Sequence, residues 1–523
     1  MDSVKDKIET KNGQHGANHK EAKDLARGAV VNFLGMVAKV SKVLFVFVAA
    51  RYYGANALGL YFLAWSTIDI ASKLGLIGMD RSIIRDVARY NVDNSEKTRA
   101  RLFAILRFDI TIAFCLSLLV AGLVMILSPA IAELVFKDAN LIRPLKIMAL
   151  ALPLVVLSHA FIASTKALRI MRYDALIRGG LEPFILLIGT LALMPLKLGA
   201  TGLVMAQVFA SFVAAATALF VAYRTYRFLG WHWKPLSKKI RKETIRYTSP
   251  MAVMDFLDLL VFRMDIMLVG AFLTTTSAGF YGIIVEIISV IKRVRQGFEP
   301  IFAPIVSQLF YSKQKERLQR NYVLVTRWLI AGTMLPMTAI VLYPNQILSL
   351  FKVISSEAAL ALVVLALAHG IFGVFSASEN LLLMTGRSWL NTLLIALKLL
   401  VNGSVAILLI PRLGMVGASL GMLSAFAFVS GVRIYHGYRR LDLNPFSYAL
   451  LWPLTTAGLT MVLFFFVKNW LTATSVPITA LILVMLSIFY VSIYFLGAMQ
   501  PEERHLIVKL KDKLRRKPAI LKA

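Results

Sequence analysis

Cysteine and charged residues are both scarce in this chain of 523 residues. The single cysteine, Cys115, excludes an intramolecular disulfide framework and a cysteine-based zinc site. Only 16% of the residues are charged and 58% are hydrophobic, against roughly 25% and roughly 45–50% in soluble domains. This composition argues against a soluble globular protein.

Acidic residues are few, and two common catalytic signatures are missing. The 28 Asp and Glu residues leave the 58 Lys and Arg residues with a formal net charge of +30. In a soluble protein this excess suggests a nucleic-acid partner, whereas in a membrane protein it marks the cytoplasmic loops. Neither a Gly-x-x-x-x-Gly-Lys-Ser/Thr loop nor a His-Glu-x-x-His sequence occurs, which removes the sequence signals for ATP hydrolysis and zinc proteolysis. We therefore expect no cofactor, no metal site and no enzymatic activity.

Long apolar runs are what the chain has in abundance. Continuous runs of about 20 apolar residues predict transmembrane helices, and they favour a helical bundle over a barrel with alternating strands. The expected fold is an all-α polytopic membrane protein with about fourteen transmembrane helices. The predicted spans are residues 28–50, 57–78, 105–128, 145–165, 175–196, 199–223, 248–273, 277–297, 322–348, 356–384, 388–410, 414–436, 446–467 and 476–497.

The positive charges agree with this segmentation. Lys and Arg concentrate on the cytoplasmic side of membrane proteins. With the N-terminal tail inside, 43 of the 58 Lys and Arg residues fall on the inside connections and tails, counting Arg178 and Arg433 at helix margins with their loops. Both termini are then predicted to be cytoplasmic. Residues 1–27 lack the apolar core of a cleavable signal, so we expect the first helix to remain in the mature protein.

Two sequence matches predict an internal repeat. Leu58–Tyr61 resembles Ala278–Tyr281 at an offset of 220 residues, and Pro195–Gly202 resembles Pro411–Gly417 at an offset of 215 for their glycines. Because an even number of helices separates the matches, the expected arrangement is two six-helix lobes in a parallel pseudo-repeat with a cleft between them, plus two C-terminal helices. The predicted parts are a cytoplasmic tail (1–27), the first lobe (28–223), a basic cytoplasmic linker (224–247), the second lobe (248–440), the added helices (441–497) and a basic cytoplasmic tail (498–523).

One segment carries a family resemblance. Residues 50–61, with the sequence ARYYGANALGLY, resemble the end of helix 1 and the start of helix 2 in Wzx-like polysaccharide flippases of the multidrug/oligosaccharidyl-lipid/polysaccharide superfamily. The likeness extends to an Arg-rich loop after helix 2, with Arg81, Arg85 and Arg89, and to the Gly-x-x-Gly turns that follow a proline. For this family, the resemblance implies two lobes around a central cavity that passes a lipid-linked glycan across the bacterial inner membrane by alternating access.

Basic residues inside apolar runs are candidates for substrate binding, because burying a charge in the membrane costs several kcal/mol. The candidates are Lys39, Lys42, Lys73, Arg263 and Lys398. Lys39 and Lys42 are three residues apart and share a helix face. If helices 1, 2 and 7 line the cleft, as the resemblance implies, these cations would bind a diphosphate, with Arg forking two oxygens. The alternative is local neutralisation, in which Asp69 pairs with Lys73 and Asp265 with Arg263.

Acidic residues inside spans are candidates for ion coupling. A carboxylate in the membrane that takes up a proton in one state and releases it in another provides what ion-coupled transport needs. The candidates are Asp258, Asp265 and Glu286. Asp258 and Asp265 are seven residues apart and therefore lie on one helix face. The alternative is that these acids pair with the intramembrane cations and hold helices together.

The leading hypothesis is a flippase that moves an isoprenoid-diphosphate-linked oligosaccharide to the outer face for the biosynthesis of a surface polysaccharide, such as the O-antigen of lipopolysaccharide or an exopolysaccharide. Its expected partners are the lipid-linked oligosaccharide, membrane lipids, and a glycan polymerase and glycosyltransferases of the same pathway, with no nucleic acid. A multidrug exporter of the same superfamily is a second hypothesis, and it requires an acidic cavity for cationic drugs. A membrane-embedded glycan polymerase or ligase is a third. It requires a large outside loop with clustered Arg or His, but the longest outside loop has only Lys137 and Arg143 as basic residues.

Overall fold

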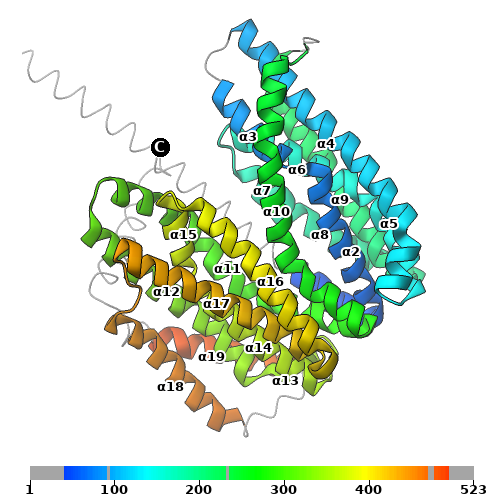
Figure 1. Ribbon diagram of the computed structural model, residues 1–523. Coiled ribbons are helices and arrows are strands. Elements are labelled where there is room, and N and C mark those ends of the chain that lie inside the picture. The colour runs from blue at the N-terminus through cyan, green and yellow to red at the C-terminus, as the bar shows by residue number, and fades with distance from the viewer. Residues whose placement is uncertain (1–40, 91–94, 231–234, 469–475, 494–523) are drawn as a thin grey trace, which may run out of the picture. The chain divides into compact units, whose positions relative to one another are not determined.

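The computed structural model describes residues 41–90, 95–230, 235–468 and 476–493, and every regular element in these residues is a helix (Figure 1). The predicted all-α polytopic fold is confirmed. The chain divides into two compact units, Met1–Ile283 and Ile284–Ala523, each of which is described by itself.

The first unit begins with helical residues 41–52 and ends with the first residues of α11. Its helices are α2 (Gly54–Leu76), α3 (Met79–Tyr90), α4 (Glu96–Ala130), α5 (Ile142–Ala149), α6 (Ala151–Ala167), α7 (Arg172–Leu176), α8 (Glu182–Leu193), α9 (Ala200–Tyr226), α10 (Lys238–Phe272) and the start of α11 (Thr275–Tyr311). The shorter turns are the π-helical η1 (Ile131–Val135) and η3 (Ile177–Leu181), and the 3-10 helical η2 (Ala139–Leu141), η4 (Met194–Leu196) and η5 (Arg227–Leu229).

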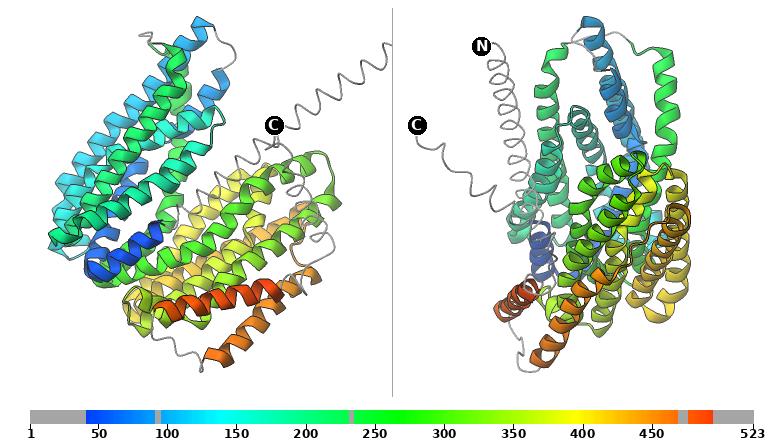
Figure 2. Two further views of the ribbon diagram at one scale, coloured as in Figure 1. Left: turned by 180° about the vertical axis from the view of Figure 1, so that it is seen from behind. Right: turned by 90° about the vertical axis from the view of Figure 1, so that its left-hand side faces the viewer.

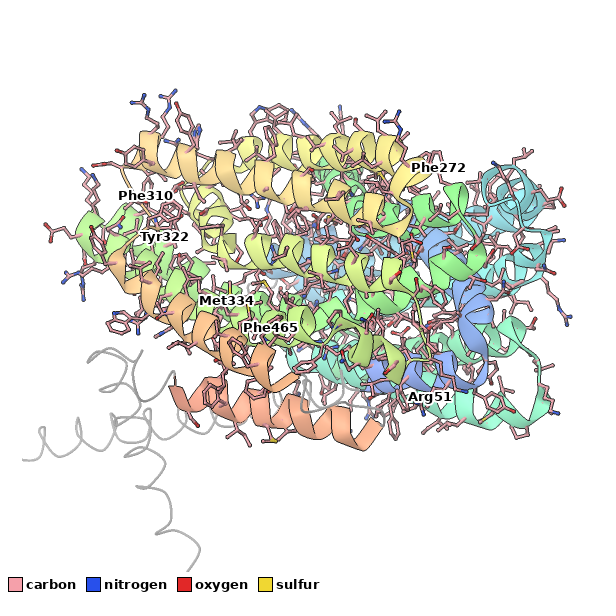
Figure 3. The ribbon with its side chains drawn as sticks, turned by 90° about the horizontal axis from the view of Figure 1, so that it is seen from below. Arg51, Phe272, Phe310, Tyr322, Met334 and Phe465 are labelled. Atoms are coloured by element: carbon pink, nitrogen blue, oxygen red, sulfur yellow. The ribbon has the colours of Figure 1, made fainter. Side chains whose placement is uncertain are left out.

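The second unit contains the rest of α11 and the elements that follow it. These are α12 (Lys315–Leu342), α13 (Pro344–Leu350), α14 (Ser356–Val374), α15 (Ser376–Met384), α16 (Ser388–Leu413), α17 (Met415–Leu441), the 3-10 helical η6 (Tyr448–Leu450), α18 (Leu451–Lys468) and α19 (Val476–Ile493). α16 and α17 form a long antiparallel pair, and α18 packs against α12 and α19 (Figure 2). Phe310 and Tyr322 meet in a buried cluster at one end of this unit (Figure 3).

The helices have the length and composition of membrane spans. Among the described residues, eight helical segments are long and apolar enough to cross a membrane, and the pair α2 and α3, bent by 41°, makes a ninth if it forms one span. Each of the fourteen predicted spans overlaps a helix in the structure. Apolar side chains such as Ile126, which is 75% exposed, cover the outside of α4, as expected for a surface that faces lipid.

The structure corrects the sequence analysis at two basic segments. The Arg-rich stretch after helix 2, predicted as a loop, is helix α3, which begins after a break where Ile77 and Gly78 have positive φ. The basic run from Lys238, predicted to lie in the linker, is the first part of α10. The Ser237 side chain caps this helix by accepting a hydrogen bond from the Ile240 amide at 3.4 Å. Hydropathy missed α3 and the first part of α10 because their residues are polar.

The second repeat match has a direct structural counterpart. Gly199 precedes α9 with φ 56° and ψ −138°, and Gly414 precedes α17 with φ 60° and ψ −136°. This conformation is accessible almost only to glycine. In both turns the amide three residues later, of Gly202 or Gly417, donates to the glycine carbonyl. The two turns therefore share one backbone geometry.

The first repeat match brings equivalent residues into contact. A Cβ atom on Gly59 of α2 would overlap the carbonyl oxygen of Thr275, and one on Gly279 of α11 would overlap the carbonyl oxygen of Ala55. Both equivalences have the offset of 220 residues that the sequence match predicted. Reciprocal contacts of this kind define a local pseudo-two-fold axis. The first turns of α2 and α11 thus cross at backbone contact, which only glycine permits.

Candidate functional site

A cavity of about 240 Å³ lies inside the first unit. Residues of the segment 41–52, α2, α6, η3, α8, α9 and α10 line it. Charged, amide, imidazole and aromatic side chains converge on it. Convergent polar groups in a concave site make it the candidate binding site.

One stripe of α2 forms a wall of the cavity. Tyr61, Trp65 and Asp69 follow one another at four-residue intervals and therefore lie on one face of the helix. They present a hydroxyl, an aromatic ring and a carboxylate in succession. On α6, Val155 and His159 line the cavity with the same spacing.

A π-helical turn places two charged side chains in another wall. Arg178 lies in η3, and Glu182 follows it at the start of α8, with Gly179 and Gly180 between them. Single π-helical turns are frequent at functional sites because they change the direction of side chains within a helix. Arg178 is 40% exposed, and its Nη1 lies 3.5 Å from the Asp174 carboxylate.

Both carboxylates of the cavity accept hydrogen bonds from protein donors through one oxygen each. The Glu182 carboxylate accepts hydrogen bonds from the Gln207 amide at 3.2 Å and from the Ser211 hydroxyl at 3.4 Å. The Gln207 carbonyl oxygen accepts from the Tyr61 hydroxyl at 2.8 Å. Asp69 accepts from Arg263, with Nη2 at 2.7 Å and Nε at 2.9 Å from the same oxygen, Oδ2. Three cationic side chains, those of Lys42, Arg178 and Arg263, line the cavity beside the two carboxylates.

This arrangement suits an anionic ligand that is rich in acceptors. Three cations line the cavity beside two carboxylates, so its lining carries an excess of positive charge. Each carboxylate also accepts hydrogen bonds from protein donors through one of its oxygens. Electrostatic and hydrogen-bonding complementarity therefore favour phosphate or carboxylate groups.

The structure places two of the five predicted substrate-binding residues in this cavity, Lys42 and Arg263. Lys73 lies one turn beyond Asp69 on α2, is half-buried, and is not among the lining residues. Lys398 belongs to the second unit and is 2% exposed, with its Nζ 5.3 Å from the centre of the Phe372 ring. Lys39 lies outside the described residues.

The expected local ion pairs are not the ones that form. Asp69 pairs with Arg263 on α10 and not with Lys73. Asp265 is 3% exposed and accepts a hydrogen bond from the Tyr281 hydroxyl at 3.4 Å. The spacing of four residues allows the local pair, but the guanidinium from a neighbouring helix reaches the carboxylate with two donors.

The predicted ion-coupling residues do not gather at the cavity. Asp258 is half-buried on α10, and Asp265 lies two turns further along the same helix; neither is among the lining residues. Glu286 is in the second unit, where its Oε1 lies 4.0 Å from Arg293 and accepts a hydrogen bond from Ser289 at 3.5 Å. Their role in coupling stays a prediction.

The second unit contains its own buried polar network. The Glu379 carboxylate accepts hydrogen bonds from Arg433 at 3.0 Å and from Arg295 at 3.2 Å. Arg433, which the sequence analysis counted with a cytoplasmic loop, is 1% exposed and also donates to the Asn391 side chain at 2.8 Å. This largely buried salt bridge joins side chains of helices α11, α15 and α17 and so fixes how these helices pack together.

Sequence reasoning missed several cavity residues. Arg178 was treated as a helix-margin residue, and Glu182, Gln207 and His159 were not assigned a role at the site. The signal that identifies them is pairs of polar residues four apart within apolar helices, such as Arg178 with Glu182 and Gln207 with Ser211. Such pairs place two polar groups on one helix face, where the membrane would otherwise exclude them.

Comparison with known proteins relates the chain to a group of membrane proteins. The family model described as polysaccharide biosynthesis protein matches residues 48–351, more than half of the chain. Stage V sporulation protein B of Bacillus subtilis (strain 168) is 30% identical over 135 residues, which are 26% of this chain and 24% of that protein. The match therefore spans about a quarter of the length of this curated relative.

Solved structures with the same fold are membrane transporters. The lipid II flippase MurJ in an inward closed conformation superposes with a TM-score of 0.70 at 13% identity, covering 89% of this chain and 99% of that chain. A multidrug resistance transporter of the MATE family in the MOP superfamily, in an inward-facing conformation, gives a TM-score of 0.61 at 16% identity, covering 78% and 94%. At these identities the likeness concerns the fold.

Proposed function

This chain belongs to the polysaccharide biosynthesis protein family, as its resemblance to polysaccharide exporters predicted, and we propose that it flips an isoprenoid-diphosphate-linked oligosaccharide across the membrane. The glycan and diphosphate pass through the protein while the lipid tail stays in the bilayer. The proposed setting is the bacterial cytoplasmic membrane, with both termini cytoplasmic and with two lobes, 28–223 and 248–440, that alternate access. The proposed pathway is the biosynthesis of a surface polysaccharide.

The observation that carries this proposal is the excess of positive charge in the cavity of the first unit. Three cations line it beside two carboxylates, and each carboxylate already accepts hydrogen bonds from the protein through one oxygen. A diphosphate supplies the missing negative charge and acceptor oxygens. The volume of about 240 Å³ is below the roughly 300–1,000 Å³ of pockets for drug-sized ligands, which suits a diphosphate with its first sugar.

The multidrug-exporter alternative is disfavoured by the same balance. A cationic drug is stabilised by an excess of negative charge, but three cations line this cavity beside two carboxylates. The polymerase or ligase alternative has no supporting feature among the described residues that line the cavity.

The function is tested in proteoliposomes with a labelled oligosaccharide on an isoprenoid diphosphate. Flipping by the wild type is compared with the Lys39→Ala/Lys42→Ala double variant and with Arg178→Gln. We expect each to be roughly tenfold slower, because a charge-assisted hydrogen bond to the diphosphate is lost. Arg172→Gln is the matched control, since Arg172 is exposed, contacts Tyr173 and does not line the cavity.

Two results would separate the hypotheses. Normal flipping by the double variant and by Arg178→Gln would contradict the assignment of the cationic site. Failure of the wild type to flip any lipid-linked glycan, together with robust export of cationic dyes, would overturn the flippase in favour of a drug exporter.

A further inference from the structure

An ion pair between two cavity walls has the geometry of an occupied ligand site. Arg263 on α10 and Asp69 on α2 are 194 residues apart in sequence, and their helices pack side by side. The Arg263 Nε and Nη2 atoms form the fork that binds two oxygens of a phosphate or carboxylate. Here both atoms converge on one oxygen, Oδ2 of Asp69. The third guanidinium nitrogen, Nη1, donates to none of the described residues.

The pair is open to the cavity. Arg263 and Asp69 both line it, and their side chains are 23% and 16% exposed. Solvent-exposed ion pairs contribute about 0.2–1 kcal/mol and parting a sealed pair costs several times more, so this partly exposed pair lies between the two. A ligand with two or more negative charges in the cavity can therefore displace the carboxylate.

The pair differs from the other charged contacts of this unit. Arg81 and Asp255 form a two-oxygen fork, with distances of 2.8 Å and 2.5 Å, but neither residue lines the cavity. Glu182 is held by neutral donors, and Arg178 pairs with an acid outside the cavity. Within the described lining residues, Asp69 with Arg263 is the ion pair whose two members both face the ligand space.

We propose that Asp69 is an internal competitor of the substrate: its carboxylate occupies Arg263 until a diphosphate group takes its place. This inference rests on the proposed function and extends it to specificity. Ligands with little negative charge cannot displace Asp69, so the pair selects diphosphates over weakly charged glycolipids. Displacement also breaks a tie between α2 and α10, which belong to different predicted lobes, so that occupancy is linked to their separation.

Lys73 supplies a new partner for the displaced carboxylate. It lies four residues after Asp69 on α2, the spacing at which an acid and a following lysine stabilise a helix. In this structure the Lys73 side chain makes no hydrogen bond or ion pair with the described residues. The ion pair between Asp69 and Lys73 that the sequence predicts is thus assigned to the substrate-bound state.

The competition is tested on the purified full-length protein in nanodiscs, with calorimetric titration of inorganic pyrophosphate. We expect Asp69→Asn to tighten binding at least about fivefold, because it removes the competing carboxylate while keeping the side-chain size. Asp442→Asn is the matched control: Asp442 is ion-paired with Lys315, lies in the second unit, and has a left-handed backbone that Asn tolerates. Its affinity should equal that of the wild type.

Two further variants identify the partners. The gain in pyrophosphate affinity from Asp69→Asn should vanish when Arg263→Gln is added, because the gain comes from the guanidinium that the first substitution frees. Lys73→Gln should weaken pyrophosphate binding more when residue 69 is Asp than when it is Asn. Farnesyl diphosphate is titrated in parallel: a similar gain for both probes supports competition for the diphosphate itself, and a gain for farnesyl diphosphate alone assigns the site to a lipid headgroup.

Three results would overturn the inference. These are an affinity of Asp69→Asn for both probes that is equal to or weaker than that of the wild type, a gain that persists without Arg263, and no binding of either probe to either protein. The flipping assay keeps the proposed function separate. If the wild type flips the lipid-linked glycan but Asp69→Asn tightens the binding of neither probe, the competitor is ruled out and the flippase stands.

Discussion

Trp65 is the largest of the apolar side chains that line the cavity, whereas its neighbours on α2, Tyr61 and Asp69, give it polar contacts. A sugar ring has an apolar C–H face that packs on an aromatic ring, and a diphosphate has none. The two parts of the proposed substrate therefore use different residues. We expect the cationic side chains to bind the diphosphate and the indole to bind the first sugar.

Replacement of Trp65 separates these two contacts. Trp65→Leu is expected to slow flipping of the oligosaccharide-linked lipid severalfold, because the stacking surface is lost, and to leave pyrophosphate affinity unchanged. Flipping in proteoliposomes and calorimetry measure the two effects. Trp389→Leu is the control, since Trp389 is exposed on α16. An equal loss of pyrophosphate affinity in Trp65→Leu would show that the residue supports the fold of the cavity and not a sugar contact.

Sequence reasoning at this scale found charges but not their partners. Lys42 and Arg263 were predicted because a cation inside an apolar run stands out. The pairing of Arg263 with Asp69 was not predicted, since helix spacing reports only neighbours on one helix. Arg178 was missed because hydropathy gave its helix a late start, at residue 175, whereas the helical segment begins at Arg172.

At the scale of helices, α2 and α11 cross at a very short distance. Gly59 and Gly279 meet there with their backbones in contact. The sequence revealed this pair only as a repeat, because no pattern in one helix shows that a glycine touches another helix. The repeat nevertheless predicted the right equivalence, and the local pseudo-two-fold axis follows from it.

A methyl group at this crossing should be costly. Gly59→Ala would place its Cβ onto the carbonyl oxygen of Thr275, so we expect a destabilisation of about 1–3 kcal/mol from overpacking. Gly122→Ala on α4 is the matched control, because nothing lies within 4 Å of its added Cβ and alanine favours a helix interior. Thermal unfolding in detergent compares the two. A melting temperature for Gly59→Ala at or above that of Gly122→Ala would contradict the crossing.

A polar ladder joins α3 to α10 along one antiparallel face. Asp255 pairs with Arg81, the Tyr247 ring lies 3.9 Å from the Arg85 guanidinium, and the Thr244 hydroxyl donates to Asp86 at 3.0 Å. Exposed ion pairs part at little cost, about 0–1 kcal/mol each. α3 and α10 belong to different predicted lobes, so we expect this ladder to open if the two lobes alternate access.

Cross-linking tests whether the ladder opens. Arg81→Cys/Asp255→Cys in a Cys115→Ser background gives a protein with two cysteines, which a short cleavable bifunctional thiol reagent can join. We expect flipping to stop after cross-linking and to return after cleavage, whereas each single-cysteine variant treated with the reagent keeps flipping. Full transport by completely cross-linked protein would show that α3 and α10 stay together throughout the cycle.

At the scale of the whole molecule, hydropathy and charge predicted the all-α polytopic fold, because the membrane requires every spanning backbone to satisfy its own hydrogen bonds. Helix ends were less predictable. α10 and α11 extend over 35 and 37 residues, beyond their apolar cores, since polar residues continue a helix outside the membrane as readily as inside it. The division into lobes at residues 224–247 stays a prediction.

The central claim is that the protein recognises the diphosphate of a lipid-linked glycan and carries it across the membrane. The most direct measurement compares two labelled substrates in proteoliposomes, with the same isoprenoid and the same oligosaccharide joined by a diphosphate or by a neutral glycosidic bond. We expect the diphosphate form to be flipped at least about tenfold faster, because only it engages the cationic side chains of the cavity. Equal rates for the two substrates, or export of a cationic dye in preference to both, would contradict the claim.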